Sequence, residues 1–297
     1  MRHLLDMDDL TSQELATVLD LAEHREVPAL LAGQGVGLLF EKPSARTRNS
    51  MEIAVVQLGG HPVSIRGEEV GLGVRESVDD LTRTLAAYHR VLGARVFDHA
   101  TVEAMAAVDA VPVINLLSDR AHPLQTLADL LTMRQRFKQL AGLTVAWVGD
   151  GNNVCNSLII GAAMSRMHVR VATPPGFEPS SLAIEKARDA GGRVFLTNDP
   201  AEATGVADAV CTDVWSSMGQ ESEAEARRSA FDGYTVDETL MDKANPGAIF
   251  LHCLPAHRGE EVAAEVIDGP SSLVWQQAAN RLHAARGLLL FLLGAHS

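Results

Sequence analysis

Short apolar runs alternate with amphipathic stretches along the first half of the chain. The apolar runs lie at 37–40, 62–65, 90–97 and 111–117. The apolar spacing is that of a helix at 11–24, 49–58, 76–89, 102–108 and 123–137. Thr11 or Ser12 can cap the first of these helices, with Glu14 in its first turn. Short strands separated by helices of this length predict βαβ units and therefore a parallel sheet.

The same alternation occurs again in the second half. Apolar runs typical of strands lie at 144–148, 168–172, 194–197, 209–213, 248–254 and 273–276. Helical patterns lie at 153–167, 180–190, 200–207 and 236–244, and a long C-terminal helix is expected from about 277. The architecture repeats although the sequence does not. We therefore expect an α/β fold with two doubly wound parallel-sheet domains and an active-site cleft between them.

A length of 297 residues is enough for two domains of this kind. We expect the first domain at 1–137 and the second at 138–280, with a C-terminal helix at 281–297 packing back on the first. A hydrophobic content of 46% with 21% charged residues is typical of a globular protein. The net charge is −13 and the four lysines are scattered, which argues against a nucleic-acid partner.

The chain has three cysteines, Cys155, Cys211 and Cys253, which are far apart and form no CxxC pair. A disulfide framework is therefore not expected, and reduced thiols in a cytoplasmic protein are the simplest interpretation. The N-terminus is acidic where a signal peptide would be basic and then apolar. The late apolar run at 288–293 is far shorter than the about 20 residues that span a bilayer, so no membrane association is expected.

Polar clusters follow several of the expected strands, at 44–48, 118–125, 149–153, 213–220 and 252–257. In doubly wound sheets, ligands bind beyond the carboxyl ends of the strands. The first cluster combines Ser44 and Thr47 with Arg46 and Arg48 at the start of a helix, where backbone N–H groups favour anions. An ordinary capped helix start is the alternative, but the density of hydroxyls and guanidiniums favours a phosphate site.

His122 and Gln125 are three residues apart at a strand-to-helix turn, so both can face one point. They suit recognition of a carbonyl and an amide, and a capping histidine with a solvated glutamine is an equally good interpretation. The cluster at 149–153 is only half of a dinucleotide fingerprint. Its two asparagines suit a carboxylate better, and the alternative is a tight turn.

Asp213 directly follows an apolar strand and could hold an ammonium group, although a surface loop with one buried anchor is slightly favoured on composition. Cys253 could be a nucleophile, a metal ligand with His252 or His257, or a polarizable group near an amine. A metal site is disfavoured because no further cysteine or histidine has ligand spacing. A nucleophile is weakly supported because Cys253 heads no obvious helix.

Taken together and in this order, the clusters resemble the aspartate/ornithine transcarbamoylase family over nearly the whole chain. The carbamoyl-phosphate signature Ser-x-Arg-Thr-Arg matches 44–48, and His-Pro-x-Gln matches 122–125. Two further motifs resemble the ornithine branch: His-Cys-Leu-Pro at 252–255, and Asp213 with Ser-Met-Gly at 217–219. The aspartate branch has proline in place of Cys253. Ala45 departs from the threonine of many relatives.

The resemblance implies transfer of the carbamoyl group of carbamoyl phosphate to the δ-amine of ornithine, giving citrulline and phosphate. It implies catalytic roles for Arg95, His122 and Cys253. Carbamoyl phosphate would be bound by Ser44, Ala45, Arg46, Thr47, Arg95, His122, Gln125, Cys253, Leu254 and Arg281. Ornithine would be bound by Asn153, Asp213, Ser217 and Met218. The first domain would hold carbamoyl phosphate and the second would hold ornithine.

The resemblance further implies that the reaction needs no metal and no organic cofactor, and that the protein is a cytoplasmic homotrimer, or a multiple of trimers, in arginine biosynthesis. Two alternatives stay open: a transcarbamoylase for a related amine or an acylated ornithine, and a non-catalytic regulator that binds carbamoyl phosphate or an amino acid. Asp213 and Asn153 favour a free amino acid as substrate, because both would be idle with a plain diamine.

Overall fold

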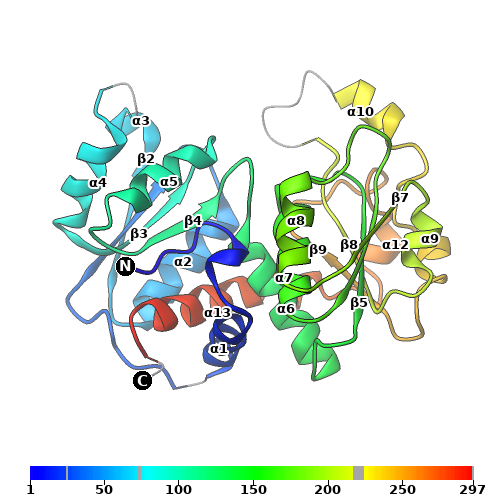
Figure 1. Ribbon diagram of the computed structural model, residues 1–297, viewed down its shortest axis with the longest axis horizontal. Coiled ribbons are helices and arrows are strands. Elements are labelled where there is room, and N and C mark those ends of the chain that lie inside the picture. Colours follow the sequence, from blue (N-terminus) through cyan, green and yellow to red (C-terminus); the bar gives the residue numbers. More distant parts are fainter. Residues whose placement is uncertain (25, 72–74, 217–223, 296–297) are drawn as a thin grey trace. The chain divides into compact units, whose positions relative to one another are not determined.

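The computed structural model describes residues 1–24, 26–71, 75–216 and 224–295. The chain divides into two compact units (Figure 1). The first comprises residues 1–128 and 279–297, and the second comprises residues 129–278. Two long helices, α6 (Pro123–Phe137) and α13 (Val274–Leu292), contribute residues to both units.

The first unit is built on a four-stranded parallel sheet with the strand order β2-β1-β3-β4. Its strands are β1 (Gly35–Phe40), β2 (His61–Arg66), β3 (His89–Arg95) and β4 (Val113–Leu117). Its further helices are the 3-10 turn η1 (Met7–Asp9), α1 (Ser12–Glu23), α2 (Ala45–Gln57), α3 (Gly67–Val70), α4 (Val78–Ala86) and α5 (His99–Ala107). In Figure 1, α4 and α5 lie on one side of the sheet and α1 and α2 on the other.

The second unit is built on a five-stranded parallel sheet with the order β7-β6-β5-β8-β9. Its strands are β5 (Thr144–Val148), β6 (His168–Ala172), β7 (Val194–Thr197), β8 (Ala209–Thr212) and β9 (Ile249–His252). Its helices are α7 (Asn153–Met164), α8 (Ser181–Asp189), α9 (Pro200–Thr204), α10 (Ala224–Ala230), α11 (Glu238–Met241) and α12 (Ala264–Ile267). The strand order reverses between β5 and β8, which is where ligands bind in such sheets.

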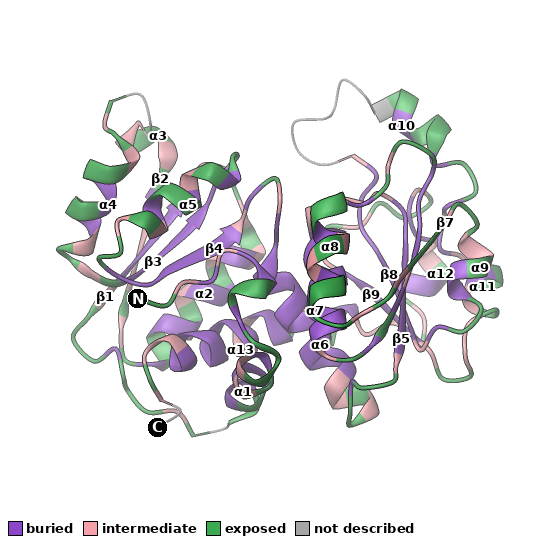
Figure 2. Cartoon of the chain, viewed as in Figure 1, coloured by how far each residue is buried: buried purple, intermediate pink, exposed green. Residues whose placement is uncertain are grey.

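The predicted α/β fold with parallel strands is confirmed in both units. The central strands are buried along their length, as Figure 2 shows, because helices cover both faces of a parallel sheet. The predicted cap of the first helix is also present: the Thr11 side chain accepts from the Glu14 N–H at 3.2 Å, and Glu14 accepts from the Thr11 N–H at 2.8 Å. Among the described residues, no helix is both long enough and apolar enough to cross a bilayer.

Several predicted boundaries were wrong. The expected strand at 273–276 is reduced to one parallel bridge between Phe250 and Ser272, and α13 begins at Val274 rather than 277. The apolar run there is too short for its period to separate a strand from the first turn of a helix. Helix α4 ends at Ala86, so the expected helix at 76–89 is too long. Helix α10 (Ala224–Ala230) was not predicted.

Candidate active site

Helix α2 begins earlier than expected, at Ala45 instead of 49, so the Ser44–Arg48 cluster is the cap and first turn of the helix. Ser44 is the N-cap, and its hydroxyl accepts from the Thr47 N–H at 3.2 Å. The cluster directly follows β1, so the first backbone N–H groups of α2 lie at the carboxyl end of the sheet. This placement combines a helix dipole with hydroxyl and guanidinium groups and suits an anion.

The two arginines of this turn do not share one environment. The Arg48 Nε donates to Ser64 Oγ at 3.3 Å, and the same guanidinium lies 3.6 Å from the Glu52 carboxylate. It also lies over the Phe40 ring at 5.5 Å. Arg48 therefore points to strand β2, a placement that the sequence analysis did not anticipate. The i,i+4 spacing to Glu52 is the signal that could have shown this.

Arg281, on α13, brings three other predicted residues together. Its Nη2 donates to Thr47 Oγ1 at 3.2 Å and its Nη1 donates to Gln125 Oε1 at 2.5 Å. The same Nη1 lies 3.5 Å from His122 Nε2. All four side chains are buried. The first turn of α2, the start of α6 and the C-terminal helix thus meet at one guanidinium, within the first unit.

The surroundings of His122 hold its imidazole in the neutral form. Burial lowers the pKa of His122 well below its usual value, and the charges of Arg281, Arg95 and Arg46 lower that pKa further. Arg95 is itself buried at the end of β3. Three guanidiniums close enough to act on one buried ring form a local positive region in a chain of net charge −13. A small anion with a polar carbonyl fits this region.

In the second unit, three loops at the carboxyl end of the sheet meet at Asp213. The Asp213 Oδ1 accepts from the Val214 N–H and from the Cys253 thiol, both at 2.8 Å. The Asp213 Oδ2 accepts from Asn152 Nδ2 at 2.8 Å. Asp213 is buried, and Cys253 is partly exposed. Because its thiol donates to a carboxylate, Cys253 holds its hydrogen toward Asp213, which does not suit a thiolate nucleophile.

The remaining predicted residues lie in different settings. Asn153 is the first residue of α7 and is partly exposed, and Ala45 is exposed in the first turn of α2. Ser217 and Met218 lie outside the described residues. Leu254 has a positive φ of 60° and precedes a cis peptide bond to Pro255.

The Leu254 N–H donates to His252 Nδ1 at 2.8 Å, so the other ring nitrogen, Nε2, carries hydrogen toward Glu261 at 3.1 Å. Asp213, His252 and Cys253 could offer metal-ligating atoms within 4.8 Å of one another, as could His257, Glu260 and Glu261. In the first group, the hydrogen bonds described above already engage both ring nitrogens and the thiol. These contacts favour a hydrogen-bonded amine site over a metal site.

Two family models match this chain. The carbamoyl-phosphate-binding domain of aspartate/ornithine carbamoyltransferases matches residues 2–135, and their aspartate/ornithine-binding domain matches residues 141–292. The chain belongs to the aspartate/ornithine carbamoyltransferase family. The resemblance drawn from the sequence motifs is thereby confirmed.

Individual members of the family are similar over nearly their whole length. An ornithine carbamoyltransferase of Thermus thermophilus is 50% identical, over 98% of this chain and 97% of that protein. One of Acidothermus cellulolyticus is 48% identical, over 99% of this chain and 97% of that protein. The structure of the ornithine carbamoyltransferase of Pyrococcus furiosus has a TM-score of 0.95 at 43% identity, covering 99% of this chain and 97% of that one.

The sequence analysis missed Asp150 and Arg227, and it interpreted Asn152 as a carboxylate ligand or part of a tight turn rather than as a helix cap. Asn152 caps α7 by accepting from the Val154 and Cys155 N–H groups, and the same side chain donates to Asp213. An asparagine directly before a helix is a capping signal that could have been recognised.

The nearly buried Arg227 donates to Asp150 and to the Trp215 carbonyl, and its guanidinium lies 4.8 Å from the Phe177 ring centroid. Burial raises the pKa of Asp150 to about 6; Arg227 opposes this rise and Asp213 adds to it. Nothing in the local sequence pairs Asp150 with a residue so distant along the chain.

Proposed function

We propose that this carbamoyltransferase transfers the carbamoyl group of carbamoyl phosphate to the δ-amine of ornithine, giving citrulline and phosphate. The observation that carries the proposal is the meeting of Thr47, His122 and Gln125 at Arg281. This arrangement offers donors and an acceptor to a small amide in a positively charged, buried setting. The first unit supplies the carbamoyl-phosphate site and the second supplies the ornithine site.

The phosphate end of carbamoyl phosphate lies on the first turn of α2. The backbone of Ala45 and its neighbours, the hydroxyls of Ser44 and Thr47, and the Arg46 guanidinium bind its oxygens. Ala45 contributes through its N–H, which no side chain is needed to provide. Gln125 and Arg281, joined by a 2.5 Å hydrogen bond, bind the amide end.

Arg95, His122 and Thr47 polarise the carbonyl group and stabilise the oxyanion of the tetrahedral intermediate. A neutral His122 suits this role because it donates a hydrogen bond without becoming an acid that protonates the amine. The lowered pKa of His122, caused first by burial and then by three arginines, keeps it in that form. The arginines also balance the charge of the departing phosphate.

Ornithine binds to the second unit through Asn153, Asp213, Ser217 and Met218. The Asp213 carboxylate holds an ammonium group of the amino acid and keeps the Cys253 thiol beside the reacting amine. The neutral δ-nitrogen attacks the carbonyl carbon, a C–N bond forms, the C–O bond to phosphate breaks, and the nitrogen loses a proton to the departing phosphate. Positioning and charge stabilisation supply the rate acceleration.

We further propose that the protein is a cytoplasmic enzyme of arginine biosynthesis that works as a homotrimer or a multiple of trimers. Exposed apolar side chains on α2, Ile53 and Val56, support an interface between copies. Sedimentation equilibrium of the full chain tests the assembly. A trimer that I53D/V56D converts to monomers supports this interface, and an unchanged trimer contradicts it.

The direct test of the activity is citrulline formation from carbamoyl phosphate and ornithine, with putrescine and an N-acylated ornithine as competing amines. Product should form faster with ornithine than with the other amines. The rate of citrulline formation should rise toward alkaline pH because a side-chain amine has a free pKa of ~10.4. Product only with another amine would refute ornithine as substrate. Tight binding of carbamoyl phosphate with no product from any amine would instead support the regulator.

A further inference from the structure

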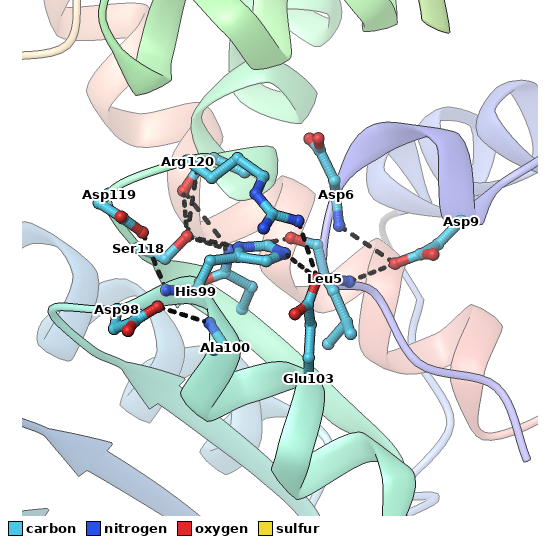
Figure 3. A network of polar contacts seen from close by, with 12 residues as sticks. Leu5, Asp6, Asp9, Asp98, His99, Ala100, Glu103, Ser118, Asp119 and Arg120 are labelled. Carbon is cyan, nitrogen blue, oxygen red and sulfur yellow. Dashed lines mark hydrogen bonds and ion pairs between the residues drawn. The ribbon is translucent and has the colours of Figure 1, made fainter. Parts of the chain in front are cut away.

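His99 connects the loop that follows Arg95 to the loop that carries His122. It lies at the start of α5, four residues after Arg95, and its ring is buried. Its Nδ1 lies 2.7 Å from the Oγ of Ser118, which directly follows β4 and precedes His122 by four residues. Figure 3 shows the ring directed at this hydroxyl from across the two loops.

Two backbone contacts join the same loops. The Asp119 N–H donates to the Phe97 carbonyl at 3.1 Å, and the Asp119 carboxylate accepts from the His99 N–H at 2.8 Å. Unlike the ring contact, these bonds do not depend on the chemistry of the His99 side chain. A change in the ring therefore tests one link while the backbone links stay in place.

Ser118 passes this link on to the turn that ends at His122. The Ser118 N–H donates to the Ala121 carbonyl at 3.0 Å, and the Ser118 Oγ accepts from the Ala121 N–H at 3.3 Å. The same Oγ accepts from Asn115 Nδ2 at 3.1 Å. With two donors on its oxygen, the hydroxyl has its own hydrogen to donate, and His99 Nδ1 at 2.7 Å is a nearer acceptor than the Ala121 carbonyl at 3.5 Å.

The His99 ring is consequently an acceptor at Nδ1 and carries its hydrogen on Nε2. Burial lowers the pKa of His99 and the charge of Arg120 lowers it further, while Glu103, Asp6 and Asp119 oppose the shift. The Nε2 atom lies 3.7 Å from the Glu103 carboxylate. Protonation at Nδ1 would place two hydrogens between His99 and Ser118, and the link would be lost.

We propose that His99 is a positioning residue for carbamoyl transfer, and that its neutral ring, acting through Ser118, sets the 118–121 turn from which His122 reaches the carbamoyl group. The proposal rests on the carbamoyl-phosphate site assigned above. It adds a residue that touches no substrate and acts on the oxyanion-stabilising group. The same link joins the loop after Arg95 to the loop that carries His122, so it positions these two side chains relative to each other.

The test compares His99→Leu, which removes the acceptor, with His99→Asn, whose amide oxygen can occupy the place of Nδ1. We expect His99→Leu to lower kcat at least about tenfold and to change the Kd of carbamoyl phosphate less than about threefold, because the carbonyl contact strengthens in the transition state. His99→Asn should recover kcat to within about threefold of the wild type. In the wild type, kcat should fall at low pH in part because His99 becomes protonated. His99→Asn should lose that part of the fall.

His89→Asn is the matched control, since burial lowers the pKa of His89 as well but its ring lies at the start of β3, away from these loops. His89→Asn should leave kcat, and the fall of kcat at low pH, unchanged. Ser118→Ala should reproduce the loss of His99→Leu without opening a cavity at the ring. A folded His99→Leu variant with wild-type kcat, or a His99→Asn variant as impaired as His99→Leu, would overturn the proposal.

A measurement without substrate separates this proposal from the proposed function. Nitrogen-15 NMR of the histidine rings in the full chain should show His99 neutral at pH 7, with hydrogen on Nε2. Hydrogen on Nδ1 would refute the link whether or not the enzyme makes citrulline. A wild type that makes no citrulline, with His99 in the expected tautomer, would refute the function and leave the structural link in place.

Discussion

Three arginines lie close enough to His122 to lower its pKa, and each comes from a different element. Arg281 connects Thr47, Gln125 and His122, Arg95 is buried at the end of β3, and Arg46 lies in the first turn of α2. A fourth, Arg48, belongs to Ser64 and Glu52 instead. Neighbouring arginines of one turn thus have separate roles, which substitution can distinguish.

Replacing Arg46 by alanine should weaken binding of carbamoyl phosphate. Loss of a charge-assisted contact costs about 1.5–3 kcal/mol, which corresponds to an increase in Kd of about 10- to 150-fold. Arg48→Ala is the matched control and should change the Kd less than about threefold. Isothermal titration calorimetry measures both variants. Equal losses from the two substitutions would contradict the assignment of Arg46 to the phosphate.

The lowered pKa of His122 makes the protein sensitive to acid. Below about pH 6.5 the unfolded chain takes up a proton at this residue while the folded chain does not, so the free energy of unfolding falls as the pH decreases. One such proton contributes about 1.4 kcal/mol per pH unit. The stability therefore declines from the unfolded pKa down to the lower, folded pKa.

Urea unfolding at several pH values between 7 and 5 measures this slope. His122→Gln should lower the slope of unfolding free energy against pH by at most the contribution of one proton, about 1.4 kcal/mol per pH unit. This expectation holds whatever the substitution does to the stability at pH 7. A slope that is the same in His122→Gln and the wild type would mean that His122 titrates normally in the folded protein.

At the level of single residues, the sequence predicted positions better than partners. Ser44, Thr47, His122 and Gln125 stand beside strand ends, and the period of the chain shows where strands end. The partners of Arg281 are separated from it by more than 150 residues, and no local pattern pairs them. Its place in the site came only from the family resemblance, as did the roles of Arg95 and Cys253.

Helix α10 is attached to the rest of the second unit through the side chain of one of its residues, Arg227. Arg227 of α10 donates to the Trp215 carbonyl and to Asp150, and so fastens the helix to the loops after β8 and β5. Stacking of Trp215 on Phe231, with ring centroids 5.5 Å apart, extends the same cluster. The loop after β8 begins with Asp213, so this fastening helps to fix the proposed amine site.

Arg227→Met should lower the free energy of unfolding by about 3 kcal/mol, because removing one partner of a mostly buried ion pair leaves the other charge uncompensated. Arg228→Met is the neighbouring control: its exposed pair with Glu260, at 3.0 Å, should contribute at most about 1 kcal/mol. Urea denaturation monitored by tryptophan fluorescence compares them. Similar losses in both variants would show that burial of Arg227 matters little.

Strands with a continuous apolar run were predicted well, and the brief run before α13 was not. The strands β5 and β8 are buried at every position, which a continuous apolar run indicates. At 273–276 the run is brief, and a backbone bond from Leu273 to Phe250 joins it to the sheet for one residue only before α13 begins. That choice between strand and helix depends on tertiary packing, which the local sequence does not contain.

For the whole molecule, the two units divide the substrates between them in our proposal, so substitutions should separate by unit. Asp213→Asn in the second unit should raise the KM for ornithine about 10- to 150-fold, since the carboxylate loses its charge toward an ammonium group. The Kd of carbamoyl phosphate should change less than about threefold. Asp213 also accepts from Asn152 and Cys253, and an amide oxygen can still accept from a donor.

Asp189→Asn, at an exposed aspartate that ends α8, controls for the change in net charge. Steady-state kinetics gives the KM for ornithine, and calorimetry without ornithine gives the Kd of carbamoyl phosphate. Arg46→Ala should give the opposite pattern, with the larger change in carbamoyl-phosphate affinity. If Asp213→Asn weakened carbamoyl phosphate as strongly as ornithine, the division of substrates between the units would be wrong, and Asp213 would have to act on both.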